Sequence, residues 1–174
     1  MRIAIIVGHL HARGGTQRQA LELARCLMEN GNDVTIFTCL LNRRKCFPKL
    51  TNSLKIISVK EVKELTFENE HNKYQLSKFR KLMWFLIMES GLNYYRRYRV
   101  MLKNSKELLS KLNFEHKKNP FDAINPHDFG AAVWAANEFK IKTNLPLIWQ
   151  CNDPLLKWDE SENIAHSIFQ KWLI

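Results

Sequence analysis

The sequence has no apolar run long enough to cross a lipid bilayer. Its longest run, residues 82–88, falls far short of the roughly 20 residues that a spanning helix needs. The apolar run at residues 3–7 is too short for the core of a signal peptide, and no small-residue cleavage site follows it. These absences predict a cytoplasmic protein, either soluble or peripheral at the inner face of the membrane.

Metal and cofactor motifs are also missing from the sequence. The four cysteines show no C-x-x-C spacing, and no histidine completes a zinc pattern with them. The glycines do not form the G-x-G-x-x-G fingerprint of dinucleotide-binding proteins, and no Walker A lysine pattern occurs. We therefore expect reduced thiols and no metal site.

Acidic residues are scarce in one segment, residues 71–118. This segment holds 12 of the 27 Lys and Arg residues but only 3 of the 17 Asp and Glu residues, so the net charge of +10 is concentrated there. A charge confined to one segment indicates a local anionic partner or surface. Nucleic acid is not expected, because no recognised nucleic-acid-binding motif accompanies the charge.

Strands and helices are expected to alternate along the whole sequence. The first unit is a strand at residues 3–7, a loop with Gly14 and Gly15, a helix at about 17–30 that Thr16 can cap and Gly31 can end, and a strand at 34–38. The later expected elements are a loop at 43–49, strands at 54–59, 121–125 and 145–149, and helices at about 74–89, 93–112, 129–140 and 160–173. This order predicts an α/β domain with a Rossmann-like, doubly wound, mostly parallel sheet.

The helix expected at residues 93–112 has one apolar stripe, which includes Leu108 and Leu112, and a basic opposite side. The basic side chains are those of Arg96, Arg99, Lys103, Lys106 and Lys111. They can contact anionic lipid headgroups, or they can be a solvated outer face over a core.

Ligands of such sheets bind at the carboxyl ends of the strands, where three loops are expected, at residues 9–16, 126–129 and 150–154. Gly14 and Gly15 before a helix can bind phosphate through backbone N–H groups, or they can form a plain tight turn. His127 can donate a hydrogen bond to a sugar hydroxyl or stabilise developing charge, or neighbouring backbone can satisfy it.

The remaining polar residues of these loops also have two interpretations. Asn152 and Asp153 can bind hydroxyl groups or form an ordinary turn. Asp128 is expected to cap the helix that follows it.

Three stretches resemble the retaining GT-B glycosyltransferases of family four, also called "glycosyl transferases group 1". The first runs from Met1 to Thr38 and contains Gly14-Gly15-Thr16-Gln17-Arg18 and Gly31-Asn32-Asp33-Val34; the others are Asp122 to Asp128 and Pro146 to Pro154. Gln17 departs from the family's acidic residue, and Asn152 stands where many members have histidine.

The resemblance implies that residues 1–174 are the N-terminal, acceptor-side domain of a two-domain hexosyltransferase, with the C-terminal donor-binding domain absent from this sequence and the fragment alone inactive. A sugar would move with retention from a nucleotide-diphosphate sugar to an acceptor such as a lipid-linked or cell-envelope glycan, without metal or cofactor. Gly14, Gly15 and Thr16 would bind the donor phosphates. His127 would contact the transferred sugar as the catalytic residue. Arg18, Asn152 and Asp153 would contact acceptor or sugar.

A second hypothesis describes a non-catalytic binding module. Its basic helices would dock on an anionic membrane or a partner protein, with Arg96, Arg99, Lys103 and Lys106 as the contact face, and the Rossmann-like domain would serve as a platform.

Overall fold

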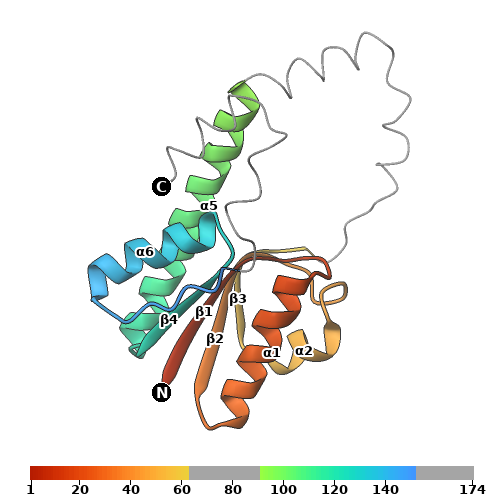
Figure 1. Ribbon diagram of the computed structural model, residues 1–174, viewed down its shortest axis with the longest axis vertical. Coiled ribbons are helices and arrows are strands. Elements are labelled where there is room, and N and C mark those ends of the chain that lie inside the picture. The colour runs from red at the N-terminus through yellow and green to blue at the C-terminus, as the bar shows by residue number, and fades with distance from the viewer. Residues whose placement is uncertain (63–90, 152–174) are drawn as a thin grey trace. The chain divides into compact units, whose positions relative to one another are not determined.

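The computed structural model describes residues 1–62 and 91–151, and side chains of α5 from residue 95 onward (Figure 1). In chain order the elements are β1 (Arg2–Leu10), α1 (Gly15–Glu29), β2 (Asp33–Leu41), α2 (Pro48–Ser53), β3 (Ile56–Glu61), α5 (Gly91–Lys118), β4 (Ala123–His127) and α6 (Ala131–Thr143). The chain divides into two compact units. The sheet belongs to the first unit, which comprises Met1–Glu64 and Met101–Asp153. The helices expected at 74–89 and 160–173 lie outside the described residues.

The four strands form a parallel sheet in the order β3-β2-β1-β4. Residues 145–150, which we call the bridge segment, continue the sheet beyond β4. Two parallel bridges attach this segment, Ile124 with Leu147 and His127 with Gln150. The expected strand at 145–149 is therefore present as a hydrogen-bonded edge without a continuous ladder. The predicted doubly wound α/β fold is confirmed.

The central strands are apolar on both faces, as expected for parallel strands covered by helices. In β1, Ile5 and Val7 pack toward α1, while Ala4 and Ile6 pack toward the opposite side. This alternation follows from the two-residue period of a strand. It produces two hydrophobic cores, one beneath α1 and α2 and one beneath α6 and residues 101–118 of α5 (Figure 1).

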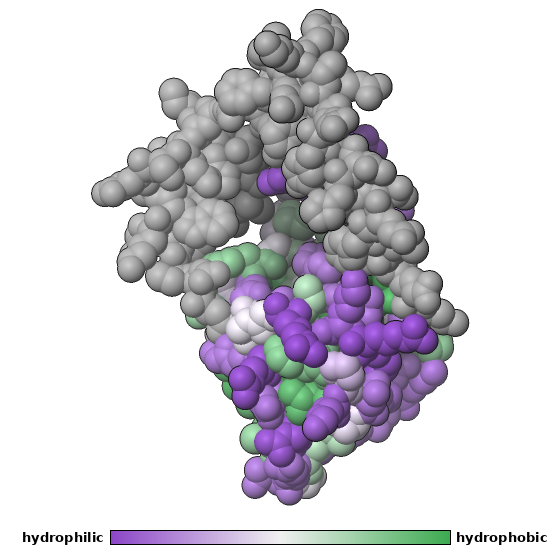
Figure 2. Space-filling view, turned by 90° about the vertical axis from the view of Figure 1, so that its right-hand side faces the viewer, coloured by the Kyte–Doolittle hydropathy of each residue, from purple (hydrophilic) through white to green (hydrophobic). Residues whose placement is uncertain are grey.

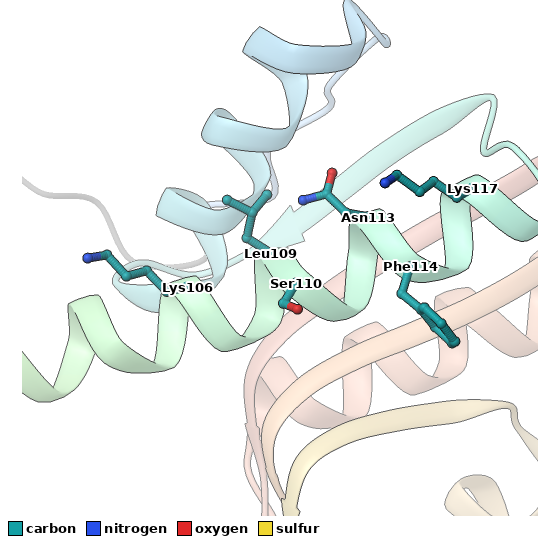
Figure 3. A pocket seen from close by; sticks show the side chains of 6 residues that line it. All are labelled: Lys106, Leu109, Ser110, Asn113, Phe114 and Lys117. Atoms are coloured by element: carbon teal, nitrogen blue, oxygen red, sulfur yellow. The ribbon is translucent and has the colours of Figure 1, made fainter.

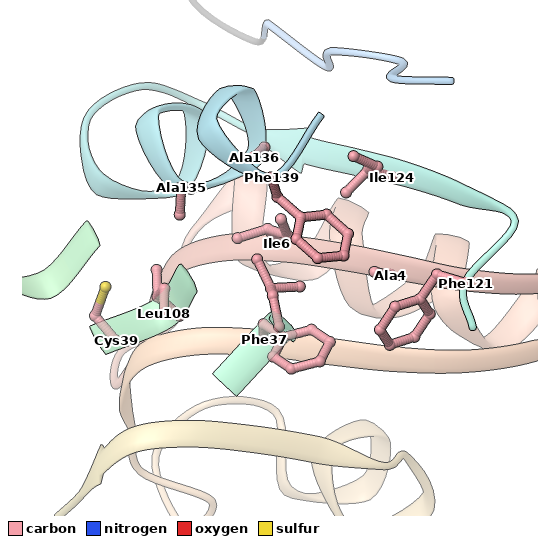
Figure 4. Packing of buried hydrophobic residues seen from close by; sticks show 12 residues of the cluster. Ala4, Ile6, Phe37, Cys39, Leu108, Phe121, Ile124, Ala135, Ala136 and Phe139 are labelled. Atoms are coloured by element: carbon pink, nitrogen blue, oxygen red, sulfur yellow. The ribbon is translucent and has the colours of Figure 1, made fainter. Parts of the chain in front are cut away.

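Aromatic side chains fill the core on the α6 side. Three phenylalanines converge between the sheet and the helix, and all are fully or almost fully buried (Figure 4). They are Phe37 of β2, Phe139 of α6, and Phe121, which lies just before β4. The rings of Phe37 and Phe121 meet edge to face, with centroids 5.8 Å apart. Small alanines of α6 let this helix approach the sheet closely; they are Ala132, Ala135 and Ala136.

The outer surface on the α1 and α2 side is mainly hydrophilic (Figure 2). On α1, Arg25 pairs with Glu22 at 3.0 Å and with Glu29 at 2.8 Å. These pairs follow the three- and four-residue spacing at which helix side chains meet. The polar face and the apolar face toward the sheet together orient α1 on the sheet.

The start of α1 differs from the prediction. Gly14, not Thr16, is the N-cap residue, and no side chain caps the helix. Thr16 lies inside the first turn, so the expected capping role is wrong. The end of α1 is as predicted, because Gly31 just beyond the helix has a φ of +80°.

Several other boundaries were misplaced. Strands β1 and β2 each continue three residues past their expected ends, to Leu10 and Leu41. Pro48 begins the short helix α2 rather than standing in a loop, since its fixed φ suits a first helical position. β4 starts two residues late, at Ala123, and α6 starts at Ala131, after Gly130 with a φ of +72°.

Helix α5 is longer than expected and ends at Lys118. Leu108 and Leu112 are fully buried in the core, as the apolar stripe predicted. The side chains of Arg96, Arg99, Lys103 and Lys106 are exposed, whereas that of Lys111 is half-buried. No helix within the described ranges is both long and apolar enough to cross a membrane.

Candidate functional site

The candidate site lies at the carboxyl ends of β1 and β4. These strands are neighbours, with Val7 paired to His127, but their connections lead toward opposite edges of the sheet. From β1 the chain passes through α1 to β2 on one side, and β4 lies on the other. Open α/β sheets bind ligands outside the carboxyl ends of the strands at such a switch point.

The glycines at the start of α1 leave the backbone open. Neither Gly14 nor Gly15 has a positive φ, so the local backbone does not require glycine at either position. A methyl group on Gly15 would meet no side chain or more distant backbone of the described residues within 4 Å, whereas one on Gly14 would press against the side-chain amide of Gln17. The first N–H groups of a helix have no partner within the helix and carry partial positive charge. The open space at Gly15 therefore suits close approach by an anionic group.

Thr16 connects this helix start to β4. Its hydroxyl Oγ1 donates a hydrogen bond to Oδ1 of Asp128 over 3.1 Å. Asp128 directly follows the last residue of β4 and has a φ of +60°. The expectation that Asp128 caps α6 is wrong, because Gly130 is the N-cap residue of that helix and has no side chain. Sequence reasoning therefore missed the link that joins the two ends.

His127 is the last residue of β4 and is fully buried, not a residue of the loop beyond the strand. Its Nε2 lies 2.8 Å from Oδ1 of Asn125. Nδ2 of Asn125 donates to the carbonyl of Ile148 over 2.6 Å, which turns Oδ1 toward the histidine. Because that oxygen can only accept, Nε2 carries the proton and Nδ1 has a lone pair. Nδ1 is buried and has no hydrogen-bond partner among the described residues.

The electrostatic environment keeps His127 neutral. Burial lowers the pKa of His127 below its usual 6.5, and the carboxylate of Asp128 opposes this shift as the smaller effect. A neutral ring with a free lone pair can accept a hydrogen bond from a hydroxyl group. His127 lies on the face of the sheet that α1 covers, because Ile124 packs toward α6 and side chains alternate along the strand.

Two further histidines stand at the end of β1. The rings of His9 and His11 meet edge to face with centroids 5.5 Å apart. Loss of solvent around His9, and to a lesser degree the nearby His11, lowers the pKa of His9, although part of its side chain reaches the surface. His9 belongs to β1 and not to the loop predicted at residues 9–16.

The other predicted site residues divide into two groups. Arg18 is exposed in α1, and its backbone N–H closes the first turn on Gly14. Asn152 and Asp153 lie outside the described residues. Within residues 1–62 and 91–151, no three His, Cys, Asp or Glu side chains are grouped so that they could hold a metal ion.

A hollow of about 530 Å³ lies elsewhere and is lined by side chains of α5 (Figure 3). Its lining residues are Lys106, Leu109, Ser110, Asn113, Phe114 and Lys117. Of the predicted site residues only Lys106 is among them. This hollow is separate in sequence from the switch point and contains none of its histidines or glycines.

No protein-family model matches the chain, and no curated protein matches it by sequence. Several solved structures are similar, among them three glycosyltransferases. The calicheamicin glycosyltransferase CalG4 is 12% identical with a TM-score of 0.53, and the match covers 98% of this chain and 41% of CalG4. Glycosyltransferase VinC in complex with DTDP is 15% identical with a TM-score of 0.48, covering 98% and 38%. The glycotransferase of kitacinnamycin is 13% identical with a TM-score of 0.44, covering 85% and 29%.

The likeness to CalG4 concerns the fold. The chain is a Rossmann-like α/β domain of the kind found within that glycosyltransferase. It spans less than half the length of each of these three proteins.

Proposed function

We propose that this chain is the acceptor-side domain of a GT-B glycosyltransferase that moves a sugar from a nucleotide-diphosphate sugar to an acceptor. One observation carries the proposal. The open helix start at Gly15 and the buried, neutral His127 belong to the same switch point, and the bond from Thr16 to Asp128 joins them. The retaining outcome and the relation to family four, which rest on the sequence resemblance, are part of the same proposal.

The two halves of the site supply different interactions. The N–H groups at the start of α1, including those of Gly15 and Thr16, would hold a diphosphate oxygen through hydrogen bonds and partial positive charge. Nδ1 of His127 would accept a hydrogen bond from a sugar hydroxyl, which fixes the sugar relative to the phosphates. Because the ring of His127 is fully buried, the atoms that cover it must move aside before a sugar hydroxyl can reach Nδ1.

The rest of the catalytic machinery would lie in a second domain. The leaving diphosphate develops negative charge, which preorganised donors and cations stabilise. Among the described residues, we assign such donors to the helix start, and no metal or cofactor is part of the proposal. We therefore expect the 174-residue chain alone to be inactive in transfer.

The test is sugar transfer by the protein produced from its native gene, assayed with UDP-, GDP-, ADP- and dTDP-linked hexoses and extracted glycolipid as acceptor. His127→Ala removes the ring, and His127→Gln keeps a donor toward Asn125 but lacks the lone pair of Nδ1. Both variants should lose transfer by about 100-fold or more, as for loss of a positioned group in a transition state. Activity near that of the unaltered protein in both variants would reject the role of His127.

A second candidate function, docking on an anionic membrane surface, has its own observation. Lys103 and Lys106 are exposed on α5, as are Arg96 and Arg99 earlier on the same helix. Among these four, only Lys103 has an ion pair within the described part of the chain, a long one of 3.9 Å to Glu107. Each basic residue near an anionic bilayer contributes about 1 kcal/mol.

Vesicle binding tests this second function. The double variant Lys103→Glu, Lys106→Glu should lose affinity for phosphatidylserine vesicles at low salt. The control Lys140→Glu, Lys142→Glu changes the net charge equally on α6, where both lysines are also exposed. Equal losses in the two double variants would show that net charge, and not the α5 face, determines binding.

A further inference from the structure

Three segments of the chain meet at Asp128. Its carboxylate accepts the hydrogen bond of Thr16 from the first turn of α1, over 3.1 Å. Its backbone N–H donates to the carbonyl of Gln150 over 3.0 Å, and its carbonyl accepts from the indole Nε1 of Trp149 over 2.7 Å. One residue thus connects α1, β4 and the bridge segment at the edge of the sheet where the proposed site lies.

The backbone of Asp128 is in the left-handed region, with a φ of +60°. Aspartate and asparagine tolerate this region better than other residues with a side chain, but it is still sparsely populated. Such conformations persist where surrounding contacts hold them, and they occur often at functional sites. The contacts of Asp128 with Thr16, Trp149 and Gln150 are of this kind.

The contact between Trp149 and Phe129 supports the same junction. Their rings meet edge to face with centroids 5.4 Å apart, directly beside the indole hydrogen bond to Asp128. The carbonyl of Asp128 is therefore held from the bridge segment, and its carboxylate from α1. A change at Thr16 or Asp128 would alter the distance between the start of α1 and the end of β4.

We propose that Asp128 is a positioning residue, which through Thr16 holds the phosphate-binding start of α1 at a set distance from the ring of His127. This inference rests on the proposed function. A phosphate bound at Gly15 and a hydroxyl bound at His127 belong to one donor molecule, so their separation must match that molecule. A displacement of about 1 Å in such a site can lower the rate by about 100-fold.

Four variants separate the hydrogen bond from other properties of the pair. Thr16→Val removes the donor and Thr16→Ser keeps it. Asp128→Gly removes the acceptor but still permits a positive φ, and Asp128→Asn keeps both an acceptor oxygen and tolerance of that φ while losing the charge. Thr16→Val and Asp128→Gly both lack the hydrogen bond between the hydroxyl and the carboxylate, whereas Thr16→Ser and Asp128→Asn can both form it.

The first readout is sugar transfer by the protein from its native gene. Thr16→Val and Asp128→Gly should each lower kcat about tenfold or more, with a smaller change in KM for the donor, and the double variant should be no worse than the poorer single variant. Thr16→Ser and Asp128→Asn should recover most of the loss. If Asp128→Asn lowers kcat as much as Asp128→Gly does, the transfer rate depends on the charge of the carboxylate, and the positioning role is rejected.

The second readout does not depend on transfer. The backbone amide signal of Gly15, followed by NMR, should shift in Thr16→Val and Asp128→Gly and stay near its original position in the two conservative variants. An unchanged Gly15 signal in both disruptive variants overturns the inference even if transfer is found. Shifts as expected in a protein that transfers no sugar from any donor would show that Asp128 holds the start of α1 through Thr16, while rejecting the proposed function.

Discussion

The ring of His127 donates from Nε2 to Oδ1 of Asn125 over 2.8 Å, and the same amide group donates from Nδ2 to the carbonyl of Ile148. Asn125 thereby connects the histidine to the bridge segment and determines which ring nitrogen carries the proton. Both residues lie on the same face of β4, two positions apart, and both are buried. The orientation of the proposed catalytic ring depends on one asparagine.

Replacing Asn125 tests this dependence. Asn125→Leu would leave the N–H of His127 and the carbonyl of Ile148 without their partner in a buried site. Each buried unsatisfied group costs about 1–3 kcal/mol, so the free energy of unfolding in urea should fall by at least that amount. Asn119→Leu is the control, because the side chain of Asn119 is exposed. Equal stability of the two variants would contradict the described hydrogen bonds.

The stability of the domain should rise with pH around the titration of His127. Burial places the pKa of His127 in the folded state below its usual 6.5, so the unfolded state binds more protons between that lowered pKa and 6.5. The stabilisation is fully present above pH 6.5 and is lost as the pH falls through the window. Urea unfolding from pH 7 to pH 5 measures it, and His127→Gln should flatten the slope. His9 acts in the same direction, so some slope should remain; an unchanged slope in the variant would refute the assignment.

The four cysteines should fall into two reactivity classes. Burial raises the pKa of Cys39 to about 12 and that of Cys46 to about 11, whereas Cys26 and Cys151 are exposed. Because the thiolate is the reactive form, iodoacetamide at pH 8 should modify Cys26 and Cys151 first, as followed by peptide mass spectrometry. In urea all four should react. Modification of Cys39 as fast as Cys26 in the folded chain would argue against the packing of β2.

The sequence was sufficient to predict the fold because its signals are local. Apolar strands of β-branched residues, a helix ended by Gly31 and the alternation of elements all depend on neighbouring residues. Boundaries were less accurate where tertiary contacts extend an element. His9 and Leu10 continue β1 because Leu40 and Leu41 of β2 pair with them, and no local pattern marks that pairing.

The site was predicted only in part for the same reason. Gly14, Gly15 and His127 were singled out from their positions at the ends of expected elements. The bond from Thr16 to Asp128 joins residues 112 positions apart, so neither residue reveals it in the sequence. The Asp128 backbone conformation and the hydrogen bond that fixes the His127 proton likewise depend on the folded sheet. Thr16 and Asp128 were both expected to be helix caps, which is the local role of their residue types.

The central claim is that the start of α1 binds the phosphates of a nucleotide sugar, and Gly15→Ala tests it most directly. The added methyl group has open space among the residues that the structure describes and no positive φ forbids it, so the fold should be unaffected. Binding of UDP, GDP, ADP and dTDP to the protein from its native gene would be measured by calorimetry for the unaltered protein and for the variant. We predict that at least one nucleotide binds, and that Gly15→Ala weakens that binding about tenfold or more with no change in thermal unfolding, because the methyl group blocks close approach to the N–H groups. Binding of equal strength in the two proteins, or no binding of any of the four nucleotides, would contradict the account.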